Sequence, residues 1–387
     1  MMKVTSLVFI LMCVLFTFLY FTTPQFLIDP RVVMYQYETA KQQISITIEQ
    51  KTLPQLVNKT VPKYTDKVCP EGIDVVWLWV NGSDPVFRQQ YERSGKKSGE
   101  GRFRDYNTLQ YSLRSVYEYA PYIKNYYIVT MDQIPSFINM SRLTYNDYKL
   151  RIVSHKEIFP DTSVLPIFNS NALEVSLHNI KNLSSCFLYL NDDMFLGNTL
   201  SPSHFIAQTG KLKIYANSWA APDKERMQKN IWHRSVGYSN ERVNAIFKQP
   251  PTKKHSYVSH HCYFFKTSIL ADLEKNLKKE YVKTRQSKFR HDDDMAVPFS
   301  HGAYAVESGN GTYIRESNYY YATFTGNRAT NLKTINNIKN KKPQCVCLND
   351  ALDKATKDQI DKETIVLHTF LDQYLPRSSP FENEVSL

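Results

Sequence analysis

The strongest constraint on the fold is an alternation of apolar runs and helical patterns that starts near Cys69. The runs are rich in β-branched and aromatic residues, as buried strands are, and they occupy Ile73–Val80, Tyr126–Val129, Leu150–Val153 and Cys186–Leu190. Apolar residues recur at helical spacing in Leu109–Ala120, Leu173–Ile180 and Leu270–Leu277. We therefore expect an α/β, Rossmann-like fold with a mainly parallel sheet flanked by helices, whose ligands bind beyond the carboxyl ends of the strands.

The charge balance leaves several classes of partner open. The 387 residues include 48 Lys and Arg against 37 Asp and Glu, a net charge of +11. A basic protein can bind nucleic acid, an anionic membrane surface or substrates that carry phosphate. Because the sequence shows no arginine-rich block and no zinc-finger spacing, only charge favours nucleic acid, and we expect no nucleic-acid partner.

The first residues predict a membrane anchor. Val4–Thr23 is an uncharged apolar run preceded by Lys3, and it has the length of a membrane-spanning helix. We expect an uncleaved signal-anchor rather than a cleaved signal peptide, because no small-residue cleavage site follows it. This gives a single-pass type II protein of the Golgi or ER with a lumenal body. Surface glycans would agree with that location, and sequons start at Asn58, Asn139, Asn182 and Asn310.

The remaining chain is divided by composition. We expect a cytoplasmic tip and anchor in 1–23, a polar stem in 24–68, a folded domain in 69–376 and a loose tail in 377–387. Six cysteines include Cys13 in the apolar run, so five remain in the body. At most two disulfides can then form in an oxidising lumen. We expect Cys69 to pair with Cys345 or Cys347, although sequence alone leaves the connectivity open.

Polar residues follow two of the predicted strands. After the first come Asn81, Gly82 and Asp84, where Gly82 permits a close backbone approach and the other two could meet a nucleotide. An ordinary Asn-Gly turn is the alternative. After the Cys186–Leu190 strand come Asp192 and Asp193. Adjacent carboxylates repel, so we expect a divalent cation, a cationic ligand or a raised pKa there, with a solvated turn as the alternative.

A second polar cluster lies further along the chain. His260 precedes an aromatic run, and Arg290 and Asp294 belong to the sequence KFRHDDD. Arginine, histidine and carboxylates are the groups of a phosphate-handling site. A salt-bridge network or a solvated loop would use the same residues. No serine nucleophile elbow, HExxH motif or P-loop is present.

Together these segments resemble the Stealth family of sugar-1-phosphate transferases, which includes bacterial capsule polymerases and the lysosomal-enzyme GlcNAc-1-phosphotransferase. Four blocks match in order: Ile73–Pro85, a stretch from Arg102 to Asp193, His260–Tyr304 and Cys347–Asp350. The sequence departs from the family at Trp77-Leu78, where Tyr-Thr is usual, at Tyr106 in place of Asn and at Cys262 in place of Pro. It also lacks the long insertions with which the vertebrate lysosomal enzyme recognises protein acceptors.

The resemblance implies a GT-A-like domain and a reaction. GlcNAc-1-phosphate or a related hexose-1-phosphate would pass from a UDP-sugar to a glycan hydroxyl, forming a phosphodiester and releasing UMP. It also implies that His260 is the general base and that Arg290 grips the transferred phosphoryl group. Asp192 and Asp193 would bind Mg²⁺ or Mn²⁺ or orient the donor, and Asp294 matches the family acid shortly after that arginine. The implied substrate-binding residues are Asn81, Gly82, Asp84, Arg102, Asp105 and Asn349.

Three other functions remain as alternatives. One is a GT-A glycosyltransferase that releases UDP, and another is a non-catalytic lumenal protein that binds glycans. The third is a protein that binds anionic ligands through its net charge alone. The sequence does not indicate the oligomeric state.

Overall fold

The computed structural model describes residues 65–95, 100–223, 230–315 and 318–383, all within a compact unit that runs from Val61 to Leu387. The predicted anchor and most of the predicted stem lie outside these residues. No helix among the described residues is long and apolar enough to cross a membrane. The expected fold class is corrected accordingly: the structure supports an α/β domain, and a transmembrane helix is not part of it.

The described strands form three sheets. The central sheet has six strands in the order β3-β4-β2-β1-β5-β9, and two three-stranded sheets have the orders β10-β7-β8 and β11-β12-β6. The strand bounds are β1 Ile73–Leu78, β2 Asn125–Thr130, β3 Thr144–Tyr145, β4 Tyr148–Ser154, β5 Cys186–Asn191, β6 Met194–Leu196, β7 Leu212–Ala220, β8 Ser256–Val258, β9 Tyr263–Lys266, β10 Gly311–Ile314, β11 Tyr319–Thr325 and β12 Cys345–Ala351.

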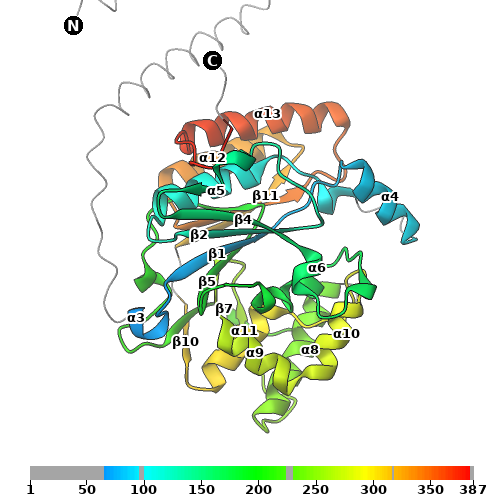
Figure 1. Cartoon of the computed structure of the whole chain (residues 1–387), viewed down its shortest axis with the longest axis vertical. Coiled ribbons are helices and arrows are strands. Elements are labelled where there is room, and N and C mark those ends of the chain that lie inside the picture. Colours follow the sequence, from blue (N-terminus) through cyan, green and yellow to red (C-terminus); the bar gives the residue numbers. More distant parts are fainter. Residues whose placement is uncertain (1–64, 96–99, 224–229, 316–317, 384–387) are drawn as a thin grey trace, which may run out of the picture. The chain divides into compact units, whose positions relative to one another are not determined.

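Helices lie on both sides of the central sheet. Figure 1 shows α5, α12 and α13 on one side and α8 to α11 on the other. The helix bounds are α3 Thr65–Val68, α4 Pro85–Arg93, α5 Thr108–Tyr119, α6 His155–Ile158, α7 Ser170–Glu174, α8 Ile231–Ile246, α9 Thr267–Asn276, α10 Lys278–Gln286, α11 Val297–Glu307, α12 Arg328–Lys341 and α13 Lys357–Tyr374. Short 3₁₀ helices are η1 Glu100–Phe103, η2 Met140–Arg142, η3 Thr162–Val164, η4 Leu177–Asn179 and η5 Pro202–His204.

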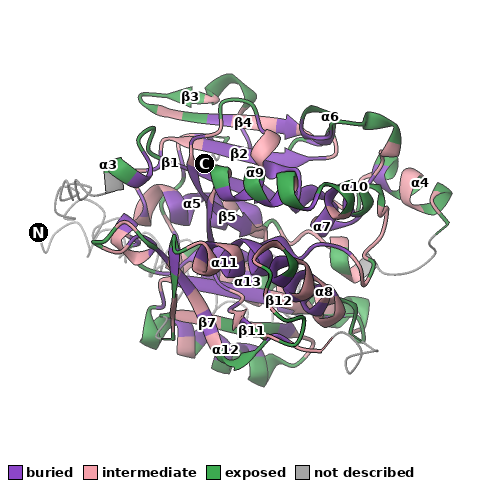
Figure 2. Ribbon diagram, turned by 90° about the horizontal axis from the view of Figure 1, so that it is seen from below, coloured by how far each residue is buried: buried purple, intermediate pink, exposed green. Residues whose placement is uncertain are grey.

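β1 is buried on both faces, as the apolar run predicts. Val75, Val76 and Trp77 have no exposed surface, and the buried residues of the central strands are seen in Figure 2. The Trp77 ring stacks on Tyr126 of β2, and its indole N–H donates to Ser112 Oγ of α5 over 2.8 Å. A buried indole N–H needs such an acceptor because an unpaired donor costs about 1–3 kcal/mol. These contacts fix α5 against the sheet.

The central sheet is mixed rather than uniformly parallel. β4, β2, β1 and β5 run parallel, whereas the edge strands β3 and β9 are antiparallel to their neighbours. The chain passes from β1 to β2 on one side, and β5 lies on the other side of β1. Such a reversal of strand order opens a crevice at the carboxyl ends of the two strands beside it. A ligand site is therefore expected beyond β1 and β5.

The predicted strands and two of the predicted helices are confirmed, and the third helix is shorter than its pattern. α5 ends before Pro121, which cannot continue a helix, and α9 covers most of Leu270–Leu277. The Leu173–Ile180 pattern is divided between α7 and η4. There Ser176 Oγ donates to the backbone oxygen of Ala172 over 3.1 Å, and such local bonds compete with the helical ladder.

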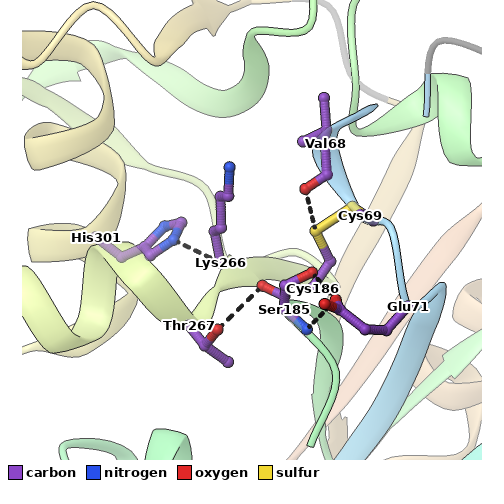
Figure 3. The surroundings of a disulfide bond; sticks show 8 residues. All are labelled: Val68, Cys69, Glu71, Ser185, Cys186, Lys266, Thr267 and His301. Carbon is purple, nitrogen blue, oxygen red and sulfur yellow. Dashed lines mark hydrogen bonds between the residues drawn. A yellow bond between two sulfur atoms is a disulfide. The ribbon is translucent and has the colours of Figure 1, made fainter. Parts of the chain in front are cut away.

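Two disulfides link residues that the strands bring together, and the predicted pairing of Cys69 is wrong. Cys69 pairs with Cys186 (Figure 3) and Cys262 pairs with Cys345, which leaves Cys347 as a buried thiol. Cys69 lies just before β1, and Cys186 is the first residue of β5. The parallel pairing of Ile73 with Cys186 places the amino ends of these two strands side by side. Because Cys69 and Cys186 are 117 positions apart in the sequence, the sequence alone does not indicate that they are close.

The predicted loose tail is also wrong in its first part. Phe381 is fully buried, and Glu382 is 5% exposed and forms a 2.7 Å ion pair with Arg114 of α5. The backbone N–H of Asn139 donates to the oxygen of Phe381 over 2.8 Å. Breaking a buried ion pair is costly because it leaves a buried charge without compensation, so the pair of Arg114 with Glu382 holds residues 377–383 against the domain.

Candidate active site

The two predicted acids lie at the crevice between β1 and β5. Asp192 and Asp193 follow the last residue of β5 and are partly exposed. β12 runs alongside, where the Leu348 N–H donates to the Asp193 backbone oxygen over 3.0 Å and the Cys347 thiol lies 3.5 Å from Asp193 Oδ2. Asp193 Oδ1 is buried and has no hydrogen-bond partner among the described residues. The turn therefore presents a carboxylate oxygen without a partner.

The electrostatics of this pair fit a divalent cation. Burial raises the pKa of Asp192 well above its usual value, and the nearby charges of Asp193 and Asp105 raise it further. Burial likewise raises the pKa of Asp193, against the opposing influence of His260. A cation that takes oxygen ligands, such as Mg²⁺ or Mn²⁺, would relieve this repulsion. The unpartnered oxygen and the concentration of carboxylates are what such an ion needs.

His260 reaches the same crevice because β9 runs antiparallel to β5. Tyr189 of β5 pairs with Tyr263 of β9, so the residues before β9 lie at the carboxyl end of β5. His260 Nδ1 shares a 2.7 Å hydrogen bond with Tyr263 Oη, leaving Nε2 as the nitrogen that can face a substrate. Burial lowers the pKa of His260, and the neighbouring Asp193 raises it. A neutral imidazole held in this way can accept a proton.

Arg290 lies in the loop between α10 and α11 and points into the same region. Its Nη2 donates to Ser170 Oγ over 2.8 Å, and its guanidinium lies 5.9 Å from the Trp232 ring centroid. Burial lowers its pKa, while the negative charge of Glu174 raises it. Among the described residues no carboxylate lies within 4.0 Å of this guanidinium. Its remaining N–H groups can therefore bind an anion.

Asp294 contributes to this arrangement by shaping the loop. It has no exposed surface, and its Oδ2 accepts from the His291 N–H and from Asn169 Nδ2, both over 2.8 Å. These bonds close the turn that follows Arg290. The structure gives Asp294 a positioning task close to the reactive groups.

Glu174 is a site residue that the sequence analysis missed. It ends α7, is 4% exposed, and accepts the Tyr189 hydroxyl over 3.0 Å on Oε1, while Oε2 has no partner among the described residues. Burial raises its pKa to about 7, although Arg290 and the Tyr189 bond act to lower it. The signal was present in the sequence, because Glu174 is an acid inside the otherwise apolar or small run Ala172–Leu177.

Arg102 lies in η1, and Asp105 lies in the segment that follows it. Burial of its inner side, followed by the charge of Arg290, lowers the pKa of Arg102 to about 10. Two guanidinium groups that influence each other in this way form a site for an anion. Asp105 accepts from the Trp79 indole N–H over 3.1 Å and from the Asn107 N–H over 2.8 Å, and burial raises its pKa.

The residues after β1 have structural tasks in this crevice. Asn81 Oδ1 accepts from the Ser83 N–H, and Asp84 Oδ1 accepts from Phe87 N–H at the start of α4. At Gly82 a Cβ atom would stand 2.4 Å from the Phe103 backbone oxygen, to which its own N–H donates. Only glycine permits this approach, and the contact draws η1 and Arg102 toward the end of β1.

Asn349 is the last of the predicted site residues. It lies in β12, two residues beyond Cys347, and is partly exposed.

Two further groups of possible metal ligands already have other partners. His291, Asp292 and Asp293 have ligand atoms within 4.8 Å of one another, but Arg234 and Lys283 already pair with the two carboxylates. His261 lies as near to Cys262 and Cys345, whose sulfurs form a disulfide.

Comparison with protein families gives four matches, all to conserved regions of one family. The Stealth protein conserved regions 1, 2, 3 and 4 match residues 71–99, 102–214, 259–307 and 336–386. They occur in the order of their numbering and contain all of the predicted site residues, together with Glu174.

Curated relatives carry phosphotransferase names. An exopolysaccharide phosphotransferase of Streptomyces coelicolor is 33% identical over 319 residues, which are 80% of this chain and 51% of that protein. The capsular polysaccharide phosphotransferase SacB of Neisseria meningitidis serogroup A is 29% identical over 323 residues, which are 80% of this chain and 57% of that protein. This chain thus spans about half the length of the curated relatives it matches.

Among solved structures, the galactosyltransferase LgtC in complex with donor and acceptor sugar analogs matches with a TM-score of 0.39 and 11% identity, over 77% of this chain and 95% of that one. This likeness is too weak to assign a role to any residue. The four family regions and the relatives lead to one conclusion: this chain belongs to the Stealth protein family.

Proposed function

We propose that this chain transfers a sugar-1-phosphate, GlcNAc-1-phosphate or a related hexose-1-phosphate, from a UDP-sugar to a glycan hydroxyl. One observation carries the proposal: His260, Arg290 and the Asp192–Asp193 pair, which come from three separate parts of the sequence, meet at the carboxyl ends of β1 and β5. The phosphotransferase names of the relatives support the same reaction class.

In this proposal each group has a chemical task. His260 Nε2 takes the proton from the acceptor hydroxyl, whose oxygen attacks the phosphorus attached to the sugar. The bond from that phosphorus to the bridging oxygen of the diphosphate breaks, and UMP leaves with the bond electrons. Arg290, with Arg102, binds the phosphoryl oxygens as charge shifts toward the leaving group. Glu174 holds the Arg290 guanidinium in place by its charge.

Asp192 and Asp193 would hold the divalent ion, with the unpartnered Asp193 Oδ1 as its first ligand. Such an ion supplies positive charge next to the diphosphate oxygens. We also propose an oxidising compartment such as the ER or Golgi lumen as the place of action, because Cys69–Cys186 and Cys262–Cys345 form disulfides.

The identity of the released nucleotide tests the reaction. The purified protein is incubated with UDP-GlcNAc carrying a labelled β-phosphate, together with a panel of glycosides and Mg²⁺ or Mn²⁺. We expect UMP in solution and the label in a phosphodiester on the glycan. Release of UDP would instead support glycosyl transfer, and binding of the donor without turnover on any acceptor would support a non-catalytic lectin-like role.

A further inference from the structure

A cavity that the proposed chemistry leaves unused opens beside the active site. It measures 410 Å³, within the range of small-molecule sites. Its walls include residues 217–219 of β7, Ser259, Arg315 and Tyr319.

Two routes of contact join this cavity to the reactive groups. On one side Ser259 directly precedes His260, and the ring centroid of Tyr321, two residues after Tyr319 in β11, lies 5.5 Å from that of His260. The acceptor hydroxyl must lie next to this histidine if His260 takes its proton.

On the other side an aromatic series leads from the cavity to the phosphoryl-binding arginine. The Trp219 ring centroid lies 6.0 Å from that of Tyr257, and the Tyr257 hydroxyl accepts the Trp232 indole N–H over 2.8 Å. Arg290 in turn lies 5.9 Å from the Trp232 ring. The cavity is therefore flanked by the groups that would serve the acceptor and the phosphoryl group.

The neutral part of the lining suits a sugar. Trp219 keeps 58% of its surface exposed, and an exposed indole offers a flat apolar face together with an N–H donor. Asn217 Oδ1 accepts from the Ser259 and Tyr319 hydroxyls over 3.2 and 3.3 Å. These bonds orient the amide so that its Nδ2 hydrogens remain available for a ligand.

The charged part of the lining suits an anion. Arg315 is exposed and donates to Ser256 Oγ over 2.9 Å. Within the described ranges no carboxylate lies within 4.0 Å of its guanidinium, and no acid lines the cavity. A guanidinium matches the paired oxygens of a phosphodiester or a carboxylate.

We propose that this cavity is the acceptor subsite and that Arg315 selects a glycan bearing an anionic group, a phosphodiester or a sugar carboxylate, next to the accepting sugar. The inference rests on the proposed function and adds the class of acceptor.

The test compares three acceptors with the wild-type protein and Arg315→Met: a phosphodiester-linked oligosaccharide, a uronic-acid oligosaccharide and a neutral oligosaccharide. We expect the variant to raise KM at least about 10-fold for whichever anionic acceptor is used, as loss of a charged hydrogen bond does. For the neutral acceptor, both kcat and KM should stay unchanged in this variant. Lys275→Met, which removes the same charge from the exposed side of α9, serves as the matched control.

Variants of Trp219 test whether the cavity binds the sugar part of the acceptor, whatever its charge. Trp219→Ala should raise KM for all three acceptors, whereas Trp219→Phe should retain most of the affinity. Equal KM changes for neutral and anionic acceptors in Arg315→Met, or no change at all, would overturn the proposal. If the wild-type protein releases no UMP, the proposed function fails, but the subsite can still be tested by calorimetric binding of the phosphodiester oligosaccharide. Weaker binding by Arg315→Met than by the wild-type protein would support the subsite. Equal binding by the two proteins would refute it.

Discussion

Arg290 is the single residue on which the proposed chemistry depends most directly. It is held by Ser170 and by the charge of Glu174, with no carboxylate bonded to it among the described residues. We expect Arg290→Ala to lower kcat by about 10²-fold or more, as the loss of a group that binds developing charge does. Steady-state rates of UMP release measure this. Arg93→Ala, at an exposed position in the last turn of α4, is the control, and near-normal turnover of Arg290→Ala would remove Arg290 from the mechanism.

The raised pKa of Glu174 leads us to expect that kcat falls on the acidic side of the pH profile. Burial raises its pKa to about 7, so the carboxylate is ionised above that pH and neutral below it. Because only the ionised form attracts Arg290, we expect kcat to fall as pH drops through about 7. Glu174→Gln should lower kcat about 10-fold at pH 8 and abolish this limb. A profile with the same limb in Glu174→Gln would show that another group titrates there.

These residues show what a sequence can and cannot reveal at this scale. His260, Arg290 and the Asp192–Asp193 pair were predicted from their neighbours in the chain. Glu174 was not predicted, because an acid in an apolar pattern indicates the solvent-exposed edge of a helix unless its burial is known. Asn81 and Asp84 were predicted as donor contacts, yet their side chains cap local backbone groups, which is the commoner use of Asn and Asp near turns.

At the scale of elements, long apolar runs were predictable and their partners were not. β1, β2, β4 and β5 follow from their sequences, since strands buried on both faces are almost wholly apolar. The three-residue strands β6 and β8 have too few residues to show a period. The disulfides likewise depend on which strands are neighbours, and pairing between strands is a property of the sheet rather than of either segment.

The junction of α9 and α10 carries a prediction of its own. Glu274 of α9 accepts from Arg285 of α10 over 2.5 Å and pairs with His178 over 2.6 Å. Burial alone would raise the pKa of Glu274, but the bonds from His178 and Arg285 lower it to about 2. A carboxyl with a depressed folded pKa stabilises the protein above its unfolded pKa, and this contribution is lost as pH falls through the folded value.

We therefore expect Glu274→Gln to lower the free energy of unfolding at pH 7 by about 1–2 kcal/mol, a figure discounted for the partial exposure of this carboxylate. The difference from the wild-type protein should shrink as pH falls from about 5 toward 2. Urea unfolding at several pH values measures it. Asp272→Asn, on the exposed side of the same helix, is the control, and a pH-independent difference would contradict the account.

At the scale of the whole molecule, topology rather than any local pattern assembles the site. The position of β5 beside β1 and the antiparallel entry of β9 bring Asp192, His260 and Arg290, which are far apart in the sequence, to one crevice. The sequence predicted an α/β sheet and the edge where its ligands bind. It could not predict the second and third sheets, or the burial of residues 377–383, because those features depend on contacts between distant segments such as Arg114 and Glu382.

Buried neutral histidines predict how the whole fold responds to acid. Burial lowers the pKa of His155 and His261 to about 4 and that of His204 and His301 to about 3. In the unfolded chain these groups titrate near 6.5. At these four sites the unfolded state therefore binds more protons than the folded state below about pH 6.5, so the histidines lower the free energy of unfolding as pH falls from there.

Buried carboxyls oppose this trend, because their raised pKa values make the folded state take up protons, as in Glu174 and Asp192. The unfolding free energy therefore changes with pH by less than the amount that four protons would give. Each histidine still contributes about 1.4 kcal/mol per pH unit. His301 Nε2 accepts the Lys266 N–H over 3.0 Å, and glutamine can also accept it. We expect His301→Gln to reduce the slope of unfolding free energy between pH 6 and 4 by about one proton, measured by urea unfolding. An unchanged slope would mean that this histidine is protonated in the folded protein and that its burial does not set the acid sensitivity of the fold.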